Sequence, residues 1–514
     1  MLGILAFIFV LGLIIIIHEL GHFYFARKAG VLCHEFSFGM GPILWQKKKG
    51  ETVYSIRAIP IGGYVMMAGE DVETSMIKKG QEVKVLVENG IVTKIVVDLN
   101  NSKYQHLDTV KVMDVDLYGK DNDLYIVVKG DEVQRYPVKR NGYYIFKKQE
   151  LMFSPYERSI ESKSYKQRFW AIFGGPMMNF ILALVAFFSV GLITGAPIMD
   201  SSRIGEVVEE GPAYLAGIRE GDVITSINDN PIETWIDVSD NLDDIVGYSV
   251  ITVTWLDSNN VDHTEFVYPV IMFYSAGFSS DTNNPHELIV GGTSNETLAG
   301  KAGLENGDKI TEIDGTDVST WQEVTEIFNN NVSGSVTTIT VLRDGIEKDI
   351  TLTPYGKEVI DSQGVGMVDS FISISPVHKF SLVGAFKSSY VGTINSLNSI
   401  VDTLKLLFGN DQVGVGDLAG PIGIYSITNK VARSGFASLI QWLGLLSVNV
   451  GVINLLPIPA LDGGRLIFLG VEVVSKKKVN RKLENTIHTA MYFALLAFFA
   501  FITWNDILRL IGIK

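Results

Sequence analysis

Two histidines and a glutamate near the N-terminus have the spacing of a metal-binding pattern. The sequence there reads His18-Glu19-Leu20-Gly21-His22. On a helix, His18 and His22 lie about 40° apart around the axis and about 6 Å apart along it, so both imidazoles can reach one metal ion while Glu19 flanks them. This arrangement is typical of zinc hydrolases, in which the metal activates a water molecule and the carboxylate acts as the base.

The pattern lies within an apolar segment. Residues Met1 to Ile17 contain no charged side chain and continue directly into His18. A signal peptide would begin with a basic region and end at a small-residue cleavage site, so this segment fits a membrane-spanning helix better. Ionisable side chains inside a membrane span are costly and indicate a functional site, and a bound divalent metal would offset that cost.

The composition predicts a membrane protein with large extramembrane parts. Hydrophobic residues make up 47% of the 514 residues and the mean hydropathy is +0.23, yet the formal net charge is -14. Apolar and acidic parts are therefore segregated along the chain. Segments long enough to cross a bilayer as helices lie in the ranges 1–25, 169–196, 437–470 and 487–514. Cys33 is the one cysteine, so an intrachain disulfide is excluded and a cysteine-based mechanism has little support.

Basic residues beside the spans predict the orientation, because Lys and Arg are retained on the cytoplasmic side. They flank the first span, precede the second and separate the third from the fourth, at Arg27, Lys28, Lys47 to Lys49, Lys163, Arg168 and Lys476 to Lys478. The region from 197 to 435 is acidic, as expected of an exported region. We therefore expect His18 and His22 to lie near the cytoplasmic end of the first span.

A zinc site needs a third protein ligand and an open position for water. Most remaining candidates by residue type lie in polar sequence, where they are ordinarily solvated; they are His34, Glu35, His106, His263, His286, His378 and His488. Asp462 follows the third span. An Asp before two glycines is ordinarily a helix cap or a turn. However, Pro457 and Pro459 break the helix at membrane depth, which is tolerated only beside protein or a water cavity. We therefore favour Asp462.

Together these motifs resemble the site-2 protease family of intramembrane zinc metalloproteases, in its bacterial RseP type with four spans and exported PDZ domains. The matching motifs are His-Glu-x-x-His in the first span, Gly-Pro-Met-Met-Asn at 175–179 in the second, and Asn-x-x-Pro-x-Pro-x-Leu-Asp-Gly from Asn454 in the third. The resemblance covers nearly the whole chain. It implies Zn²⁺ bound by His18, His22 and Asp462, Glu19 as the catalytic base, and Asn449 and Asn454 as substrate-binding residues. From ligand types alone, non-haem iron stays an alternative.

A membrane-embedded substrate must be locally unwound before its peptide bond can be attacked. Residues Ser55 to Met67 are apolar and rich in strand formers, and we expect them to pair edge-on with an extended substrate, with Gly62 and Gly63 among the contacts. An ordinary hairpin strand is the alternative. The side-chain amides of Asn179 and Asn454 are suited to binding an unwound backbone.

The acidic region contains an internal repeat with glycine at matching positions. Ala216-Gly217-Ile218 and Gly221-Asp222 in the first copy correspond to Ala302-Gly303-Leu304 and Gly307-Asp308 in the second. Each copy resembles a PDZ domain, over 197–280 and 281–356. The resemblance implies that the pair excludes substrates that still carry a bulky exported domain; a rigid spacer is the alternative.

The other ranges are less informative. We expect a cytoplasmic or membrane-associated β-rich region over 26–168, including a β-rich insert at 72–165, and a cytoplasmic loop over 471–486. The range 357–436 reads as a linker with an amphipathic helix at 383–408. This helix fits the membrane surface or the protein core, and core packing is favoured.

The predicted fold is a polytopic α-helical membrane protein with four transmembrane helices, two exported PDZ domains (α+β) and a membrane-associated β-rich insert. The expected function is cleavage of transmembrane segments of single-span proteins, such as anti-sigma factors or remnant signal peptides, after a site-1-type protease has trimmed them. The expected location is the inner (plasma) membrane, with the active site toward the cytoplasm. Partners are transmembrane substrates and the lipid bilayer, not nucleic acid. A non-catalytic PDZ scaffold or chaperone, and an anchored peptidase for soluble substrates, are the alternatives.

Overall fold

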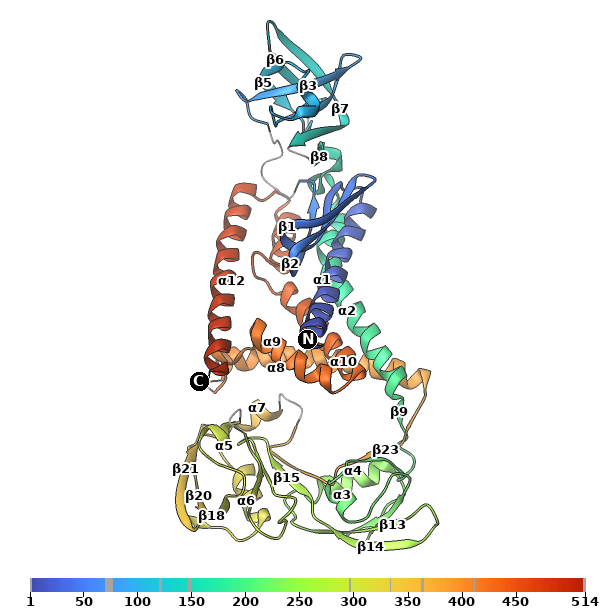
Figure 1. Ribbon diagram of the computed structural model, residues 1–514, viewed down its shortest axis with the longest axis vertical. Coiled ribbons are helices and arrows are strands. Elements are labelled where there is room, and N and C mark those ends of the chain that lie inside the picture. The colour runs from blue at the N-terminus through green and yellow to red at the C-terminus, as the bar shows by residue number, and fades with distance from the viewer. Residues whose placement is uncertain are drawn as a thin grey trace. The chain divides into compact units, whose positions relative to one another are not determined.

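The computed structural model describes residues 2–69, 77–119, 123–146, 149–294, 297–332, 334–361, 365–410 and 412–511. The chain divides into two units (Figure 1). The first comprises Met1–Phe187 and Ala419–Lys514, and the second comprises Phe188–Leu418. Residues 72–76, 120–122 and 147–148 of the expected β-rich insert lie outside the described ranges.

Four helices in the described part of the chain are long and apolar enough to cross a membrane, as the sequence predicted. They are α1 (Leu2–Lys28), α2 (Tyr165–Thr194), α10 (Phe436–Leu455) and α12 (Arg481–Leu510). Each forms one continuous helix because hydrocarbon offers no hydrogen-bond partners, so the backbone must satisfy itself. Two shorter helices, α9 (Pro421–Arg433) and α11 (Asp462–Ser475), flank α10. Because α11 ends at Ser475 and α12 begins at Arg481, most of the loop expected at 471–486 is helical.

The packing of α1, α2 and α10 forms the core of the apolar helices. Val10 and Ile14 of α1, Ala186 of α2 and Leu443 and Leu446 of α10 belong to one buried cluster. This packing brings the first and third predicted spans together.

A carboxylate joins α12 to α9 away from this cluster. Asp506 of α12 accepts hydrogen bonds from the backbone N–H groups of Gly420 (3.2 Å) and Gly423 (2.9 Å). These N–H groups belong to the start of α9, where helix donors have no partner within the helix.

Strands β1 (Cys33–Lys49) and β2 (Thr52–Met67) are long and bent, and they form a small sheet beside α1. The segment 33–38 lies in its centre, paired on one side with 63–67 and on the other with 53–56, while 45–49 pairs with 52–56. Phe36 and Tyr54 pack against Phe23 of α1. No described strand pairs with the outer edge of 63–67, so this segment has an open edge.

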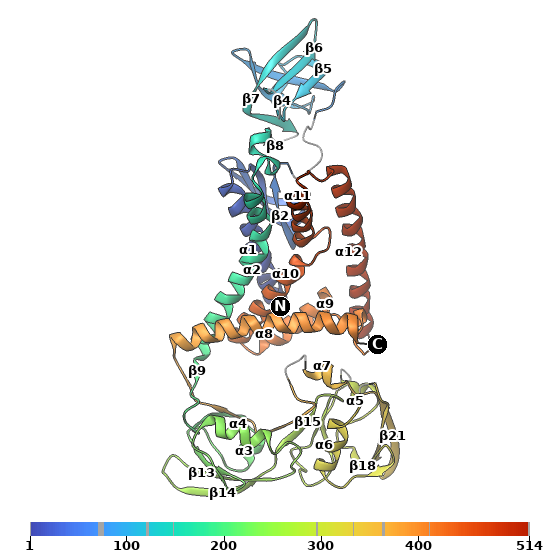
Figure 2. The same ribbon diagram turned by 180° about the vertical axis from the view of Figure 1, so that it is seen from behind.

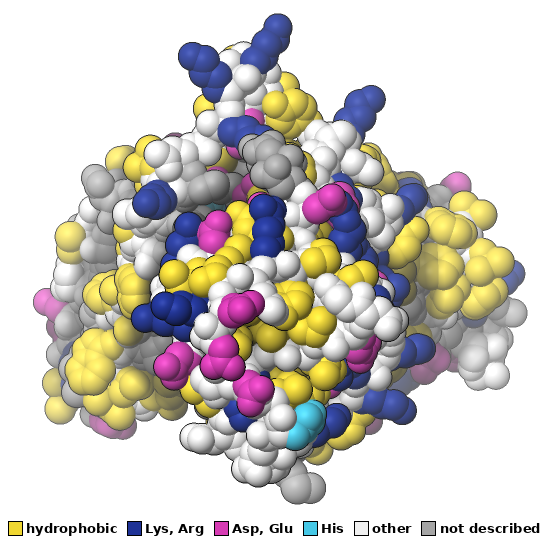
Figure 3. Space-filling model, turned by 90° about the horizontal axis from the view of Figure 1, so that it is seen from above, with side chains coloured by type: hydrophobic (Ala, Val, Ile, Leu, Met, Phe, Trp, Pro, Cys, Tyr) yellow, Lys and Arg dark blue, Asp and Glu magenta, His cyan; other side chains and the backbone are white. Residues whose placement is uncertain are grey.

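The β-rich insert folds as a barrel. Its strands are β3 (Glu82–Glu88), β4 (Ile91–Val96), β5 (Thr109–Asp116), β6 (Tyr125–Lys129), β7 (Val133–Phe146) and β8 (Gln149–Met152). The order is β4-β3-β5-β6-β7-β8, and pairing of β4 with β7 closes five of them around an apolar core that includes Val83, Val92, Ile126 and Phe153. Figure 3, a view from above, shows Lys and Arg as well as Asp and Glu side chains among apolar ones.

The second unit contains two modules with the same sheet order, as expected for an internal repeat. The first has α3 (Pro212–Leu215), β11 (Val223–Ile227), β12 (Asn230–Pro231), α4 (Trp235–Asp243), β13 (Ile251–Leu256) and β14 (Asp262–Val267), in the order β12-β11-β13-β14. The second has α5 (Leu298–Lys301), β18 (Lys309–Ile313), β19 (Thr316–Asp317), α6 (Trp321–Asn329), β20 (Thr337–Arg343) and β21 (Ile346–Leu352), in the order β19-β18-β20-β21. Thr234 and Thr320 form equivalent capping boxes at the starts of α4 and α6.

The second module is inserted into the first. Strands β15 (Val270–Phe273), β16 (Phe278–Ser280), β17 (Val290–Gly292) and β22 (Val368–Phe371) form a further sheet. Phe273 and Phe278 pack in the core of the second module with Trp321, so the division between the modules lies between Val267 and Val270 rather than at 280/281. The chain then returns to the first module, where β23 (Ile374–Pro376) pairs with β10 (Ile204–Val207).

The predicted amphipathic helix is α8 (Leu382–Gly409), preceded by α7 (Lys357–Asp361). Its buried positions are small or hydroxyl-bearing: Ala385, Ser389, Thr393 and Ser396. Val383, Phe386 and Tyr390 are each at least 65% exposed. Core packing, the favoured expectation, is therefore wrong for these three residues, whereas Leu397, Leu404 and Leu407 are partly buried.

Candidate metal centre

Three potential ligands converge from two distant parts of the chain. His18 and His22 lie on α1, and Asp462 is the first residue of α11. The Nε2 atoms of the histidines are 3.2 Å apart, and Asp462 Oδ2 lies 3.3 Å from each of them. Figure 2 shows α11, β2 and α1 close together in the first unit. The two motifs therefore meet in space.

The geometry fits a single metal ion. Zinc lies about 2.0–2.1 Å from nitrogen and oxygen ligands, and tetrahedral coordination then separates the ligands by about 3.3 Å. The three observed separations match this value. Within the described ranges, Asp462 Oδ2 is shielded from solvent and has no hydrogen-bond partner, as expected of an atom placed for an ion. A fourth position is available from the cavity described below.

Contacts behind the histidines orient their rings. Nδ1 of His22 lies 2.8 Å from the Ala171 carbonyl, so Nδ1–H donates and Nε2 is left for the metal. Nδ1 of His18 lies 3.2 Å from the side-chain amide of Asn179. If Nε2 of His18 is a ligand, Nδ1 carries the proton and the amide must present its oxygen. Asn179 is fully buried, so it lies behind His18 and not in the cavity, where the sequence prediction placed it.

Glycines allow α2 to lie directly against this site. A Cβ atom on Gly21 of α1 would lie 2.1 Å from the Gly174 carbonyl oxygen, and one on Gly175 would lie 2.3 Å from Nε2 of His22. Gly175 belongs to the motif recognised in the sequence but was not predicted as a site residue. The signal available was a Gly-Gly-Pro run inside an apolar span, since small residues permit close helix contact in membranes.

The loop before Asp462 is held by specific contacts. Ala460 has a φ of +82°, which a residue with a side chain rarely adopts, and its N–H donates to Nδ1 of His488 on α12 (2.8 Å). A Cβ atom on Gly463 would lie 2.2 Å from the Leu456 carbonyl oxygen, so the loop folds tightly on the start of α11. From the sequence, His488 was a possible ligand by residue type only, and this contact was not predicted.

A cavity of about 830 Å³ opens beside the three potential ligands. Its walls include Glu19, the open-edged segment Gly63–Met67, Asn454, and one face of α12 that carries His488. Glu19, Gly63 and Asn454, which were predicted as catalytic or substrate-binding residues, thus line the cavity. Gly62 and Asn449 were also predicted as substrate contacts but are not among the lining residues. Gly62 instead lies against Met40, where its φ of +84° permits the turn into the edge segment.

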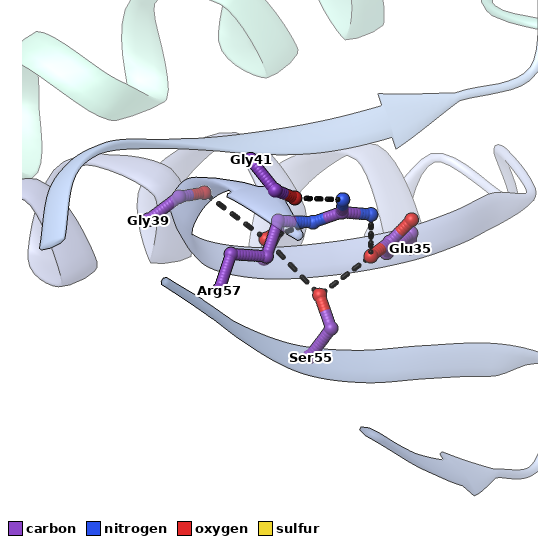
Figure 4. Close-up of polar contacts among 6 residues, drawn as sticks. Glu35, Gly39, Gly41, Ser55 and Arg57 are labelled. Carbon is purple, nitrogen blue, oxygen red and sulfur yellow. Dashed lines mark hydrogen bonds and ion pairs between the residues drawn. The ribbon is translucent and has the colours of Figure 1, made fainter. Parts of the chain in front are cut away.

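A polar network supports the sheet that carries this edge (Figure 4). The Arg57 guanidinium donates to Glu35 (2.8 Å), to the hydroxyl of Ser37 (3.1 Å) and to the Gly41 carbonyl (2.8 Å). Ser55 donates to the same carboxylate (2.5 Å). Burial and a hydrogen bond to Glu35 raise the pKa of Tyr64 to about 12, so the edge segment is joined to the network. Glu35 is therefore a structural residue and not a third ligand.

A membrane-embedded metallohydrolase is the class that this helical fold and site define. Comparison with known proteins makes the assignment specific: the sequence model of peptidase family M50 matches residues 6–498, and the chain belongs to this family.

Named relatives extend over nearly the whole chain. It is 33% identical to the zinc metalloprotease RasP of Geobacillus kaustophilus over 509 residues, covering 98% of this chain and 97% of the relative. It is 31% identical to the regulator of sigma-W protease RasP of Bacillus subtilis over 513 residues, covering 99% and 98%. The protein is a multi-pass membrane zinc metalloprotease of the site-2 type, with zinc as its cofactor.

Proposed function

We propose that this protease cleaves transmembrane segments of single-span membrane proteins after another protease has shortened their exported part. The observation that carries the proposal is the position of the candidate metal site formed by His18, His22 and Asp462. His18 and His22 lie inside an apolar helix long enough to cross a membrane, and the cavity beside them is bordered by an open strand edge.

In this proposal His18, His22 and Asp462 hold the zinc ion. When bound, zinc supplies Lewis acidity that activates water near neutral pH and polarises the scissile carbonyl. Glu19 lines the same cavity and acts as the base: it takes the proton from the attacking water and later returns it to the leaving amine. Asn179 keeps the His18 ring turned so that Nε2 faces the ion, which is a positioning role and replaces the substrate contact predicted for it.

The substrate binds as an extended segment along Gly63–Met67. A peptide bond in a membrane helix has its carbonyl and amide hydrogen engaged within the helix, so attack requires local unwinding. The open edge offers backbone donors and acceptors to the unwound segment. A Cβ atom on Gly63 would lie 3.1 Å from Cγ of Glu19, so the edge segment runs directly past the base. Asn454, whose amide donates to the Val450 carbonyl (3.0 Å), lines the cavity and is a further substrate contact.

We place the active site toward the cytoplasmic face of the plasma membrane, because the basic residues Arg27 and Lys28 end α1 and Lys476–Lys478 follow α11. The two modules of the second unit then lie on the exported side and act as PDZ-type size filters. One relative is named as a regulator of sigma-W protease, which supports a membrane-bound anti-sigma factor as a substrate class. Remnant signal peptides are the second class.

Replacing Glu19 by Gln tests the catalytic proposal. Loss of a general base typically costs about 10²–10⁴-fold in rate. We expect the E19Q variant to keep zinc while cleavage falls by this factor, and D462A to lose zinc. A non-catalytic scaffold is favoured instead if E19Q retains its activity in cells. Stoichiometric zinc in D462A would show that the third ligand is another residue.

A second comparison separates this proposal from an anchored peptidase with soluble substrates. The same single-span substrate is offered in liposomes, and its extramembrane part is offered in solution. Cleavage confined to the embedded segment is expected. Equal cleavage of the soluble part would contradict intramembrane proteolysis.

A further inference from the structure

His488 of α12 has one ring nitrogen engaged and the other free. Its Nδ1 accepts the hydrogen bond from Ala460 N–H (2.8 Å), and a neutral imidazole that accepts at Nδ1 carries its hydrogen at Nε2. Within the described part of the chain, Nε2 is shielded from solvent and has no hydrogen-bond partner. His488 also lines the cavity that is bordered by Glu19 and the candidate metal site. An unpaired donor in such a place indicates a partner that arrives with a ligand.

The position of α12 suggests which ligand group this is. Both ribbon views show α12 across from the β1–β2 sheet, with α11 between them (Figures 1 and 2). Both α12 and the edge segment Gly63–Met67 contribute to the walls of the same cavity. A substrate strand has carbonyl and N–H groups on both of its sides. The sheet edge can pair with only one side, so carbonyls on the other side need donors from the opposite wall.

Donors for the freed substrate carbonyls are especially important in a membrane enzyme. A carbonyl freed by unwinding and left without a donor in an apolar environment costs several kcal/mol. In the substrate-free protein Nε2 of His488 is covered by neighbouring protein atoms, so these atoms must move aside when a substrate carbonyl binds. The ring itself is held by its hydrogen bond with Ala460 N–H and by Phe468 of α11, at a centroid distance of 5.4 Å. The donor therefore keeps its direction while its cover is displaced.

We propose that His488 is a substrate-binding residue of this protease: its Nε2–H donates to a main-chain carbonyl of the unwound substrate, on the side that faces away from the β1–β2 sheet. Its Nδ1 at the same time holds the loop that presents Asp462. The inference rests on the proposed function, because it requires an extended substrate in the cavity. It adds a substrate contact on α12, a helix in which neither family motif nor sequence pattern had indicated one.

Two amide variants separate the two ring nitrogens. The side-chain oxygen of Asn in H488N can replace Nδ1 as an acceptor for Ala460, but the side chain is too short to replace Nε2. Gln in H488Q reaches the Nε2 position with an N–H donor but loses the acceptor at Nδ1. The probe is a synthetic remnant signal peptide, with a basic end and an apolar core, in liposomes with the purified full-length variants. Zinc content, melting temperature, kcat and KM are measured for each.

We expect H488N to keep zinc and the wild-type melting temperature, while kcat/KM falls about 5–150-fold, as expected for an unsatisfied carbonyl costing about 1–3 kcal/mol. H488Q should lower the melting temperature but keep kcat/KM, per zinc-loaded molecule, within about fivefold. T486V is the matched control, because Thr486 lies on α12 but does not line the cavity, and it should match the wild type.

A wild-type kcat/KM in H488N would overturn the inference. Parallel loss of zinc and activity in both amide variants would also overturn it, because His488 would then only hold the loop before Asp462. If H488N is unstable, backbone esters placed one at a time in the probe weaken single carbonyl acceptors for the wild-type protein. We then expect slower cleavage when the ester lies at positions that alternate with those pairing with the sheet. Unchanged cleavage at these positions would contradict the inference. Failure of the proposed function can be distinguished from failure of this inference, because the proposed function fails only if the E19Q variant is active.

Discussion

Gly175 of α2 and His22 of α1 are in such close contact that a methyl group on the glycine would lie 2.3 Å from Nε2 of the histidine. The candidate metal site is therefore built from three elements, although only α1 and α11 contribute potential ligands. The second helix forms the back wall of the site, and it can do so only where it lacks a side chain.

A Gly175→Ala substitution should displace His22 and reduce zinc binding. The added methyl group must move either the ring or α2, and both movements open the triangle of ligand atoms. We expect substoichiometric zinc by metal analysis of the purified variant, with cleavage lowered in proportion. Gly470→Ala in α11 is the control, since its Cβ atom would have no neighbour within 4 Å. Full zinc occupancy in the Gly175 variant would contradict the close contact.

The buried pair of Glu35 and Arg57 should stabilise the sheet that carries the open edge. Their side chains are 10% and 17% exposed. Removing one partner of a buried pair leaves an uncompensated charge, which costs about 3 kcal/mol or more. Arg57→Met should therefore speed hydrogen exchange of the amides in 33–38 and 63–67 and raise KM.

Arg140 provides the comparison for this prediction, because it pairs with Glu157 while its side chain is 55% exposed. Arg140→Met should leave exchange in the β1–β2 sheet and KM close to wild type. Unchanged exchange in the Arg57 variant would show that the network in Figure 4 does not hold the edge segment.

The sequence predicted the parts of the site that depend on local spacing. His18, Glu19 and His22 follow from the helical repeat, and Asp462 follows from the two prolines that end a span. The places of Asn179 and His488 depend on how α2 and α12 pack around these motifs, which no local pattern encodes. Asn179 was therefore predicted to contact substrate but lies behind His18.

The β-structure shows the same limit. The repeat in the second unit could be recognised from its glycines, because each copy forms its own turns. The insertion of one module into the other depends on pairing between β10 and β23, which are separated by the whole second module. Likewise, strand character in 55–67 was predictable, whereas the pairing of 63–67 with the central segment 33–38 was not.

Acid should weaken the junction between the β1–β2 sheet and the barrel. Burial, with a contribution from Arg158, lowers the pKa of His34 from 6.5 to about 4, and its Nε2 lies 2.8 Å from the Ser154 hydroxyl. His34 is thus neutral in the folded protein at pH 5, whereas in the unfolded chain it binds a proton below about pH 6.5. The contribution of the neutral, buried His34 to the free energy of unfolding is complete above pH 6.5. It is lost as the pH falls toward 4, and the loss is roughly 3 kcal/mol at most.

Hydrogen exchange of amides 33–38 and 149–152 at pH 7 and pH 4.5, corrected for the intrinsic pH dependence of exchange, measures this loss. His34→Asn, which cannot titrate in this range, should remove most of the difference between the two pH values. If the difference in exchange between pH 7 and pH 4.5 is the same in the wild type and the variant, the acid sensitivity belongs to other groups.

Excision of the two modules should broaden the range of substrates. Strand β9 (Ala196–Pro197) pairs with β24 (His378–Lys379), and Ile198 N–H donates to the Val377 carbonyl (2.8 Å), so the ends of the module pair lie side by side. Residues 199–376 can therefore be replaced by a two-residue Asn-Gly turn without separating α2 from α8. If the modules act as a size filter, this variant should cleave a single-span protein that keeps its folded exported domain, which the wild type leaves intact. Both forms should cleave the trimmed substrate at similar rates, which controls for damage to the metal site. Equal rejection of the untrimmed protein by both forms would favour a spacer role for the modules.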